Sequence, residues 1–159
     1  MCRLNNLILI GFKSAGKTTL GRKAAEKFNK PFIDTDDLFE EAPSIFHQKF
    51  GDEVFRKREK ELLEGLKSFS NHVIATGGGT PLDPDNQSLL RSLGTVVHLH
   101  TPKEIVRARI MSGPSSFLNG LDFDAVYDSR LGIYESVAHY SVSSENQLTK
   151  LLNSNYLHH

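Results

Sequence analysis

The stretch LILIGFKSAGKTTLG, residues 7–21, decides the fold of this chain. It runs from a short apolar segment through Gly11, Gly16, Lys17 and Thr18 into residues that favour a helix, and it satisfies the pattern G-x-x-x-x-G-K-[ST]. Glycines let successive backbone N–H groups point at one phosphate, and the helix that follows adds the positive end of its dipole. We therefore expect a strand, a phosphate-binding loop and a helix that together hold a nucleoside triphosphate.

Individual roles in this loop follow from the same pattern. Lys17 is expected to reach the outer phosphates as a catalytic cation, and the Thr18 hydroxyl is placed to ligate Mg²⁺. The loop residues expected to bind ATP are Ser14, Ala15, Gly16, Lys17, Thr18 and Thr19. The chain has no guanine-specifying N-K-x-D sequence and leaves little room for a motor or a helicase. A small-molecule kinase is therefore favoured, although the loop alone does not identify the acceptor.

Strand-like and helix-like segments alternate along the whole chain. Strands are expected at residues 6–11, 30–36, 71–79, 95–102 and 140–143, and helices at residues 17–28, 53–69, 85–94, 103–111, 122–140 and 145–153. In the second helix, Val54, Phe55, Leu62, Leu63 and Leu66 lie on or near one apolar stripe. Such alternation predicts a three-layer α/β/α fold around a five-stranded parallel sheet, in one P-loop kinase domain over residues 1–159. Right-handed crossovers then place the strand ends, and the ligands, at one edge of the sheet.

Composition narrows the function classes. Nineteen basic and 19 acidic residues balance, so we expect neither nucleic acid nor a membrane surface as a partner. The single cysteine, Cys2, excludes a disulfide within the chain. The early apolar run Leu7–Ile10 is too short for a signal sequence or a membrane span. We expect a cytoplasmic monomer, and the terminal pair His158 and His159 is left out of the argument.

Acidic residues follow the second expected strand. Asp34 ends this strand and Asp36 lies two residues further on. One carboxylate near the phosphate loop can hold Mg²⁺ through water, and another can accept a proton from an alcohol. The alternative is that one of these acids caps the next helix, a role that we assign to Asp37.

Three glycines, Gly77 to Gly79, follow the third strand. A tight turn with positive φ would need only one glycine, so three in succession indicate that the backbone approaches a ligand closely. His98 and His100 alternate along the fourth strand without a third metal ligand at suitable spacing, and we interpret them as structural. Arg56 and Arg130 are unremarkable alone, but a carboxylated acceptor requires arginine contacts of the kind they offer.

Taken together, these residues resemble the shikimate kinase family, P-loop kinases of the nucleoside monophosphate kinase type. The family shows a phosphate loop, then D-[ST]-D, G-[ED]-x-x-F-R, G-G-G and R-x-x-x-Y. The matching segments here are residues 11–18, Asp34-Thr35-Asp36, GDEVFR at 51–56, Gly77-Gly78-Gly79, and Arg130 with Tyr134. Their order and approximate spacing match over essentially the whole chain.

The resemblance implies transfer of the ATP γ-phosphoryl group to the 3-hydroxyl of shikimate, on the route to chorismate and the aromatic amino acids. It implies that Mg²⁺ is served by Thr18 directly and by Asp34 through water, and that Asp36 lies next to the acceptor oxygen. The residues implied to bind shikimate are Asp36, Arg56, Gly78, Gly79 and Arg130, within a region at about residues 34–62. Arg109 is implied to lie against adenine, and a lid at about residues 111–124 is implied to close over the site.

Two departures from the family pattern bear on these implications. The stretch between Asp36 and Gly51 is a few residues shorter than usual, which affects the acceptor pocket wall. The family's lid carries an arginine that reaches the transferring phosphate, whereas residues 113–118 read GPSSFL and no lysine or arginine lies between Arg109 and Arg130. Lys13 stands in the phosphate loop where the family usually has an uncharged residue, and we expect it to supply this charge as a catalytic residue.

Two alternatives remain open at this stage. One is a related small-molecule kinase such as a gluconate kinase, against which the glycines and the paired arginine motifs favour a carboxylated cyclic alcohol. The other is a nucleotide-binding regulator that lost catalysis together with the lid arginine. The intact D-T-D and G-G-G segments argue against this alternative.

Overall fold

A five-stranded, all-parallel sheet forms the centre of the protein, as seen in a computed structural model that describes residues 5–13, 15–112 and 122–154. The strands are β1 (Asn6–Ile10), β2 (Phe32–Asp34), β3 (Val73–Ala75), β4 (Gly94–Leu99) and β5 (Tyr140–Val142), in the spatial order β2-β3-β1-β4-β5. Every neighbouring pair is parallel, so the carboxyl ends of all five strands meet at one edge. The predicted fold class is confirmed.

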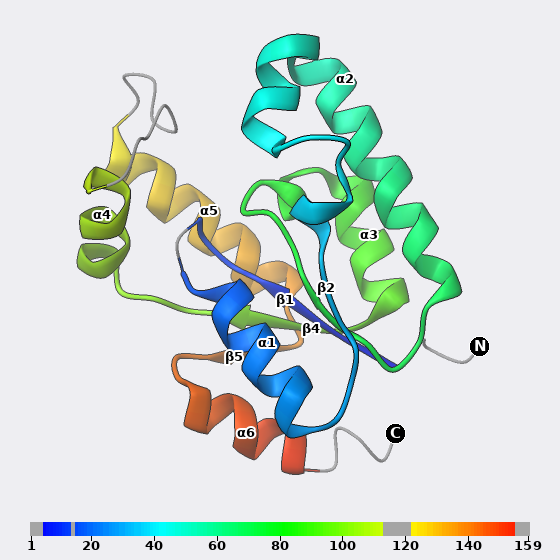
Figure 1. Ribbon diagram of the computed structural model, residues 1–159. Coiled ribbons are helices and arrows are strands. Elements are labelled where there is room, and N and C mark those ends of the chain that lie inside the picture. Colours follow the sequence, from blue (N-terminus) through cyan, green and yellow to red (C-terminus); the bar gives the residue numbers. More distant parts are fainter. Residues whose placement is uncertain (1–4, 14, 113–121, 155–159) are drawn as a thin grey trace.

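Helices cover both faces of the sheet (Figure 1). The α-helices are α1 (Lys17–Lys27), α2 (Pro43–Gly65), α3 (Pro84–Leu93), α4 (Lys103–Met111), α5 (Phe123–Val137) and α6 (Glu145–Asn153). Three 3₁₀ turns are η1 (Thr35–Leu38), η2 (Leu66–Ser68) and η3 (Thr80–Leu82). α1 and α6 lie on one face, and α2, α3 and α5 lie on the other.

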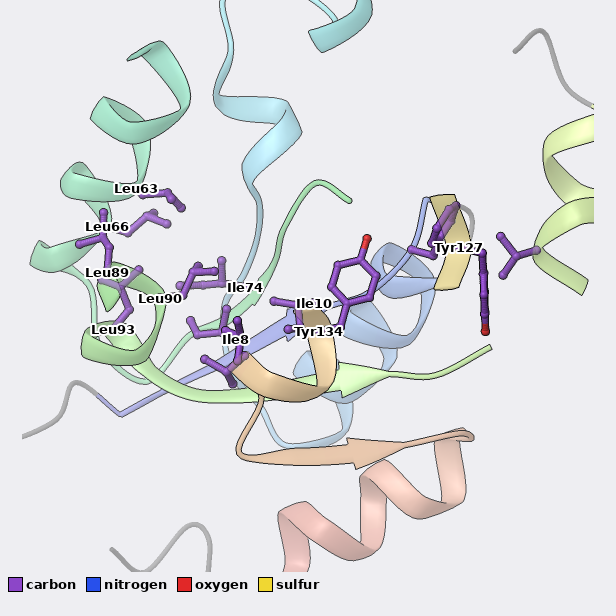
Figure 2. Packing of buried hydrophobic residues seen from close by; sticks show 14 of the residues in the cluster. Ile8, Ile10, Leu63, Leu66, Ile74, Leu89, Leu90, Leu93, Tyr127 and Tyr134 are labelled. Atoms are coloured by element: carbon purple, nitrogen blue, oxygen red, sulfur yellow. The ribbon is translucent and has the colours of Figure 1, made fainter. Parts of the chain in front are cut away.

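The pleat of β1 divides the core into two layers. Ile8 and Ile10 point into the cluster formed with α2, α3, α4 and α5, whereas Leu7 and Leu9 point toward α1 and α6. All four side chains are at most 2 % exposed, which explains why this strand is continuously apolar in sequence. Figure 2 shows leucines of α2 and α3 meeting beside Ile8 and Ile74. The central strand is thereby held rigidly between two layers.

A separate aromatic cluster lies at the start of α2, outside both layers. Phe39 stacks on Phe55 with ring centres 5.0 Å apart, and Phe46 packs edge-on against Phe39 at 5.5 Å. Phe39 and Phe46 are buried, although neither belongs to the two clusters around the sheet. The start of α2 therefore has a small core of its own, formed by these three rings.

α2 differs most from the sequence-based expectation. It begins at Pro43, ten residues before the expected start at Glu53, and Gly51 interrupts it with φ 84° and ψ 173°. The break hides the first half of the helix from a search for one continuous apolar stripe. Val54, expected on that stripe, is 44 % exposed, whereas Leu63 and Leu66 are buried as predicted.

The cap assigned to Asp37 is wrong. The side chain of Asp34 caps the turn η1 by accepting the Asp36 N–H at 3.0 Å, and Asp37 lies inside that turn. The residue before α2 is Ala42, whose side chain provides no cap. The first of the three aspartates, Asp34, is the residue directly before η1, so it takes the cap position of the turn that follows β2.

His98 is a buried structural residue of β4. It is 2 % exposed, one ring nitrogen lies 3.2 Å from the Ser141 hydroxyl, and the ring packs on Tyr134. Burial lowers the pKa of His98 to about 4, with smaller contributions from His100 and Lys17. The side chain is therefore neutral in the folded protein at physiological pH.

This burial predicts a stability profile. Because the unfolded chain protonates His98 below about pH 6.5 and the folded state does not, the free energy of unfolding falls as the pH drops toward 4, by up to about 3 kcal/mol. Urea unfolding of the wild type and His98→Gln at several pH values between 7.5 and 4.5 measures the effect. His98→Gln is expected to lose less stability than the wild type on acidification, because only the wild type gains a proton at position 98 when it unfolds. The effect of the carboxylates cancels in this comparison, since both proteins contain all of them. Equal losses would contradict the assignment.

Candidate active site

The phosphate loop joins β1 to α1 at the carboxyl edge of the sheet. Gly16 adopts the left-handed conformation, with φ 95°, directly before the helix begins at Lys17. A Cβ atom on Gly11 would lie 2.8 Å from the Leu99 carbonyl oxygen on β4, so only glycine fits there. The two glycines of the pattern thus serve different purposes, one a turn and the other a close approach to the neighbouring strand.

Lys17 lies inside this loop. Its ammonium group donates hydrogen bonds of 2.8 Å to the carbonyl oxygens of both Gly11 and Phe12, and the residue is only 8 % exposed. Burial lowers the pKa of Lys17 to about 8, against the opposing effect of the Asp36 and Asp34 carboxylates. An ammonium group has three donors, so one remains for a phosphate while two hold the loop.

Thr18 and Asp34, predicted to serve one metal ion, are in direct contact. The Thr18 hydroxyl donates to Asp34 Oδ2 at 2.6 Å, which joins the start of α1 to the end of β2. Both residues line a cavity of about 230 Å³ next to the loop. Hydroxyl and carboxylate oxygens are the donors that Mg²⁺ prefers, so this pair suits that ion.

A larger cavity of about 600 Å³ adjoins the first. Its walls come from both sides of the break in α2, the segment after β3, and α5, and they include Arg56 and Arg130. Residues that line both cavities are Lys13, Asp36, Gly77 and Gly78. A group bound in one cavity therefore faces a group bound in the other across these four residues.

Among the described residues that line both cavities, Asp36 is the one carboxylate. Burial raises its pKa, the negative charge of Asp34 raises it further, and Lys17 opposes both effects. The side chain nevertheless opens to solvent on the cavity side. A carboxylate with a raised pKa is a better proton acceptor than an ordinary aspartate, which suits chemistry on an alcohol.

Arg56 is held on the far side of the larger cavity by a residue that sequence reasoning missed. Its Nη1 atom donates to Glu59 Oε1 at 3.0 Å and lies 3.4 Å from the Gly79 carbonyl oxygen. Glu59 is 6 % exposed and also accepts hydrogen bonds from Thr80 at 2.9 Å and Asn86 at 3.3 Å. Its spacing of three residues from Arg56 on one helix was the available signal.

Arg130 and Tyr134 approach from α5. The Arg130 guanidinium lies 5.6 Å from the centre of the Phe12 ring and lines the larger cavity. The Tyr134 hydroxyl donates to the Gly78 carbonyl oxygen at 2.7 Å. Burial raises the pKa of Tyr134 to about 12, so this donor keeps its proton at any physiological pH.

Each of the three consecutive glycines makes a different close approach. A Cβ atom would lie 3.2 Å from the Asp36 carboxylate at Gly77, 3.0 Å from the Lys13 backbone nitrogen at Gly78, and 3.0 Å from the Arg56 guanidinium at Gly79. None of the three has a positive φ. The expected close approach is therefore to the chain's own functional groups, and no turn requirement explains these glycines.

Some predicted residues lie elsewhere or outside the described residues. Ala15 is buried and accepts a hydrogen bond from Thr101 through its backbone, whereas Thr19 lines the smaller cavity. Arg109 lies on the exposed side of α4, outside the residues that line the two cavities. Ser14 and residues 113–121, most of the expected lid, fall outside the described residues.

Comparison with known proteins gives a consistent result. A family model described as "Shikimate kinase" matches residues 13–158. A shikimate kinase of Syntrophus aciditrophicus is 43% identical over 70% of this chain, although the match spans only 59% of that relative. A shikimate kinase of Neisseria meningitidis is 37% identical over 88% of both chains. The structure of an Acinetobacter baumannii shikimate kinase in complex with shikimate superposes with a TM-score of 0.82 and 32% identity, covering 97% of this chain and 96% of the other.

A gluconokinase of Sinorhizobium meliloti also resembles this chain, with a TM-score of 0.55 and 16% identity. It covers 96% of this chain and 98% of its own. At this identity the likeness shows a common fold and gives no support to gluconate as the acceptor.

The contact between Gly79 and Arg56 predicts a binding defect. Gly79→Ala is expected to displace the guanidinium and to weaken shikimate binding by about tenfold, because small misplacements of a positioning group are costly. Calorimetric titration with shikimate measures the change. Gly65→Ala is the matched control, since nothing lies within 4 Å of a Cβ atom at that helical position. A folded Gly79→Ala protein with unchanged affinity would contradict this account.

Proposed function

This chain belongs to the shikimate kinase family, and we propose that it transfers the γ-phosphoryl group of ATP to the 3-hydroxyl of shikimate. The products are ADP and shikimate 3-phosphate. The observation that carries this proposal is the meeting of two cavities at Asp36, one beside the phosphate loop and the other lined by two arginines. Such an arrangement fits a triphosphate on one side and a carboxylated alcohol on the other.

The acceptor is oriented by its carboxylate. Arg56 and Arg130 line the same cavity from α2 and α5, and guanidinium groups bind carboxylates through paired hydrogen bonds. Glu59 fixes Arg56 from behind and thereby reduces the conformational entropy that binding costs. When these two arginines hold the carboxylate, the hydroxyl groups of a small ring can face Asp36, which lines the same cavity.

Asp36 accepts the proton of the acceptor hydroxyl. The acceptor oxygen forms a bond to the γ-phosphorus while the bond between that phosphorus and the bridging oxygen of ADP breaks. Lys17 contacts the outer phosphates with the donor that its two loop carbonyls leave over. Catalysis of this kind depends on alignment and charge neutralisation more than on covalent participation by the protein.

Mg²⁺ would be held by the Thr18 hydroxyl directly and by Asp34 through water. The 2.6 Å contact between these two side chains supports the assignment, since both present oxygen to the same point. When bound, the ion neutralises charge on the triphosphate. We further propose that Arg109 lies against adenine, and that Gly78 and Gly79 offer backbone contacts to shikimate.

Partners and location complete the proposal. We propose that the protein acts as a cytoplasmic monomer on ATP and shikimate alone. A balanced formal charge is consistent with the lack of a nucleic-acid or membrane partner. Among the described residues, no helix is both long and apolar enough to cross a membrane.

The first test is a coupled ADP-release assay with Mg-ATP, run with and without shikimate. ADP release is expected to depend on shikimate and to match the shikimate 3-phosphate formed. Arg56→Gln should raise KM for shikimate by about 10²-fold with little change in KM for ATP, because it removes a charged contact to the acceptor alone. ADP release indifferent to shikimate would overturn the acceptor assignment.

A pH profile tests the roles of Asp36 and Lys17. Because Asp36 must be ionised and its pKa is raised, kcat/KM should fall on acidification at a pH above the ordinary aspartate value of 3.8. Because Lys17 must be charged and its pKa is about 8, kcat/KM for ATP should fall again near pH 8. The residual activity of Lys17→Arg should lack this alkaline fall, since arginine stays protonated. An alkaline fall shared by both proteins would contradict the Lys17 assignment.

A further inference from the structure

We propose that Lys13 is a catalytic residue that places positive charge on the phosphoryl group during transfer. The proposal rests on the kinase function stated above. Of the four described residues that line both cavities, Lys13 is the one cation, beside a carboxylate and two glycines. A phosphoryl group moving from one cavity to the other passes this junction, so charge that develops on its oxygens develops next to Lys13.

The backbone of Lys13 is fixed at this place by the segment after β3. A Cβ atom at Gly78 would approach the Lys13 nitrogen to 3.0 Å and its Cα to 3.6 Å, so the two loops are in contact. Tyr134 holds the Gly78 carbonyl oxygen from α5 at 2.7 Å. The backbone of Lys13 is therefore anchored beside Gly78, at a position where the residue lines both cavities.

Other cations around the two cavities have different tasks. The Lys17 ammonium donates two of its three hydrogen bonds to the carbonyl oxygens of Gly11 and Phe12, each at 2.8 Å. Arg56 is paired with Glu59 at 3.0 Å on the far side of the larger cavity. Arg130, stacked over Phe12 at 5.6 Å, lines the larger cavity and is absent from the described lining of the smaller one.

No cation can come from the segment that follows α4. Residues 110–129 contain neither lysine nor arginine, and this holds wherever residues 113–121 are placed. Arg107, in the middle of α4, contacts Asp124 at the start of α5 and lines neither cavity among the described residues. Among the described residues, Lys13 is thus the cation whose position at the junction lets it add charge to the transferring group.

The step itself balances without a proton from Lys13. The acceptor oxygen gains a bond to the γ-phosphorus, the bond to the bridging oxygen of ADP breaks, and the hydroxyl proton passes to Asp36. Lys13 takes no part in the proton transfer and contacts the equatorial oxygens. A lysine acts as a point charge, so it contributes attraction without the geometric constraint of an arginine fork.

The test compares Lys13→Met, Lys13→Gln and Lys13→Arg with the wild type. Both neutral variants should lower kcat by about 10²-fold, the usual cost of losing one donor to a developing charge, while KM for ATP and for shikimate changes less than about threefold. Lys13→Arg should restore at least a tenth of the activity. Lys23→Met is the matched control, because Lys23 is an exposed lysine of α1 paired only with Glu145 at 3.7 Å among the described residues.

A second readout separates catalysis from loop structure. Binding of ADP with aluminium fluoride and shikimate, a mimic of the transferring group, should weaken in the neutral variants by about the factor lost in kcat, while binding of ADP alone is unchanged. A kcat within threefold of wild type, or equal weakening of ADP alone, would overturn the proposal. If the wild type ignores shikimate, the acceptor assignment fails, and Lys13 is judged by the same comparison on ATP hydrolysis to water.

Discussion

One contact organises the active site: the segment after β3 lies directly on the phosphate loop. The two segments leave neighbouring parallel strands, β3 and β1, so both emerge at the same edge of the sheet. Gly78 meets the backbone of Lys13 because it has no side chain, and Tyr134 keeps it there. The cavity beside the phosphate loop and the larger cavity therefore adjoin at this contact, and Lys13, Asp36, Gly77 and Gly78 line both of them.

Charge is distributed around this wall in pairs of opposite sign. Lys17 faces the carboxylates of Asp34 and Asp36, and Arg56 is backed by Glu59. Each pair stops a lone charge from being buried at a high desolvation cost. Glu59 shows how far this extends, because its two further hydrogen bonds reach Thr80 in η3 and Asn86 in α3. Arg56, which we propose binds the acceptor, is thus anchored through Glu59 to η3 and α3.

Much of this could be predicted from the sequence, because its strongest signals are local. The phosphate loop, the placement of Asp34 near Thr18, and the five parallel strands all follow from short patterns whose geometry is nearly fixed. The first half of α2 was missed because a glycine with positive φ divides the helix. Glu59 was missed because an acidic residue on a helix is ordinarily solvated. The burial of Glu59 became visible only in the folded structure. The same is true of the different contacts that Gly77, Gly78 and Gly79 make.

The aromatic cluster at the start of α2 has an evolutionary consequence. Phe39, Phe46 and Phe55 give one wall of the acceptor cavity a small core that is separate from the layers holding the phosphate loop. Substitutions in that wall can be absorbed by repacking three rings, without disturbing the strands that position ATP. Such a protein can change its acceptor specificity more easily than the machinery that transfers the phosphoryl group. The packing therefore separates the aromatic cluster beside the larger cavity from the strands that carry the phosphate loop.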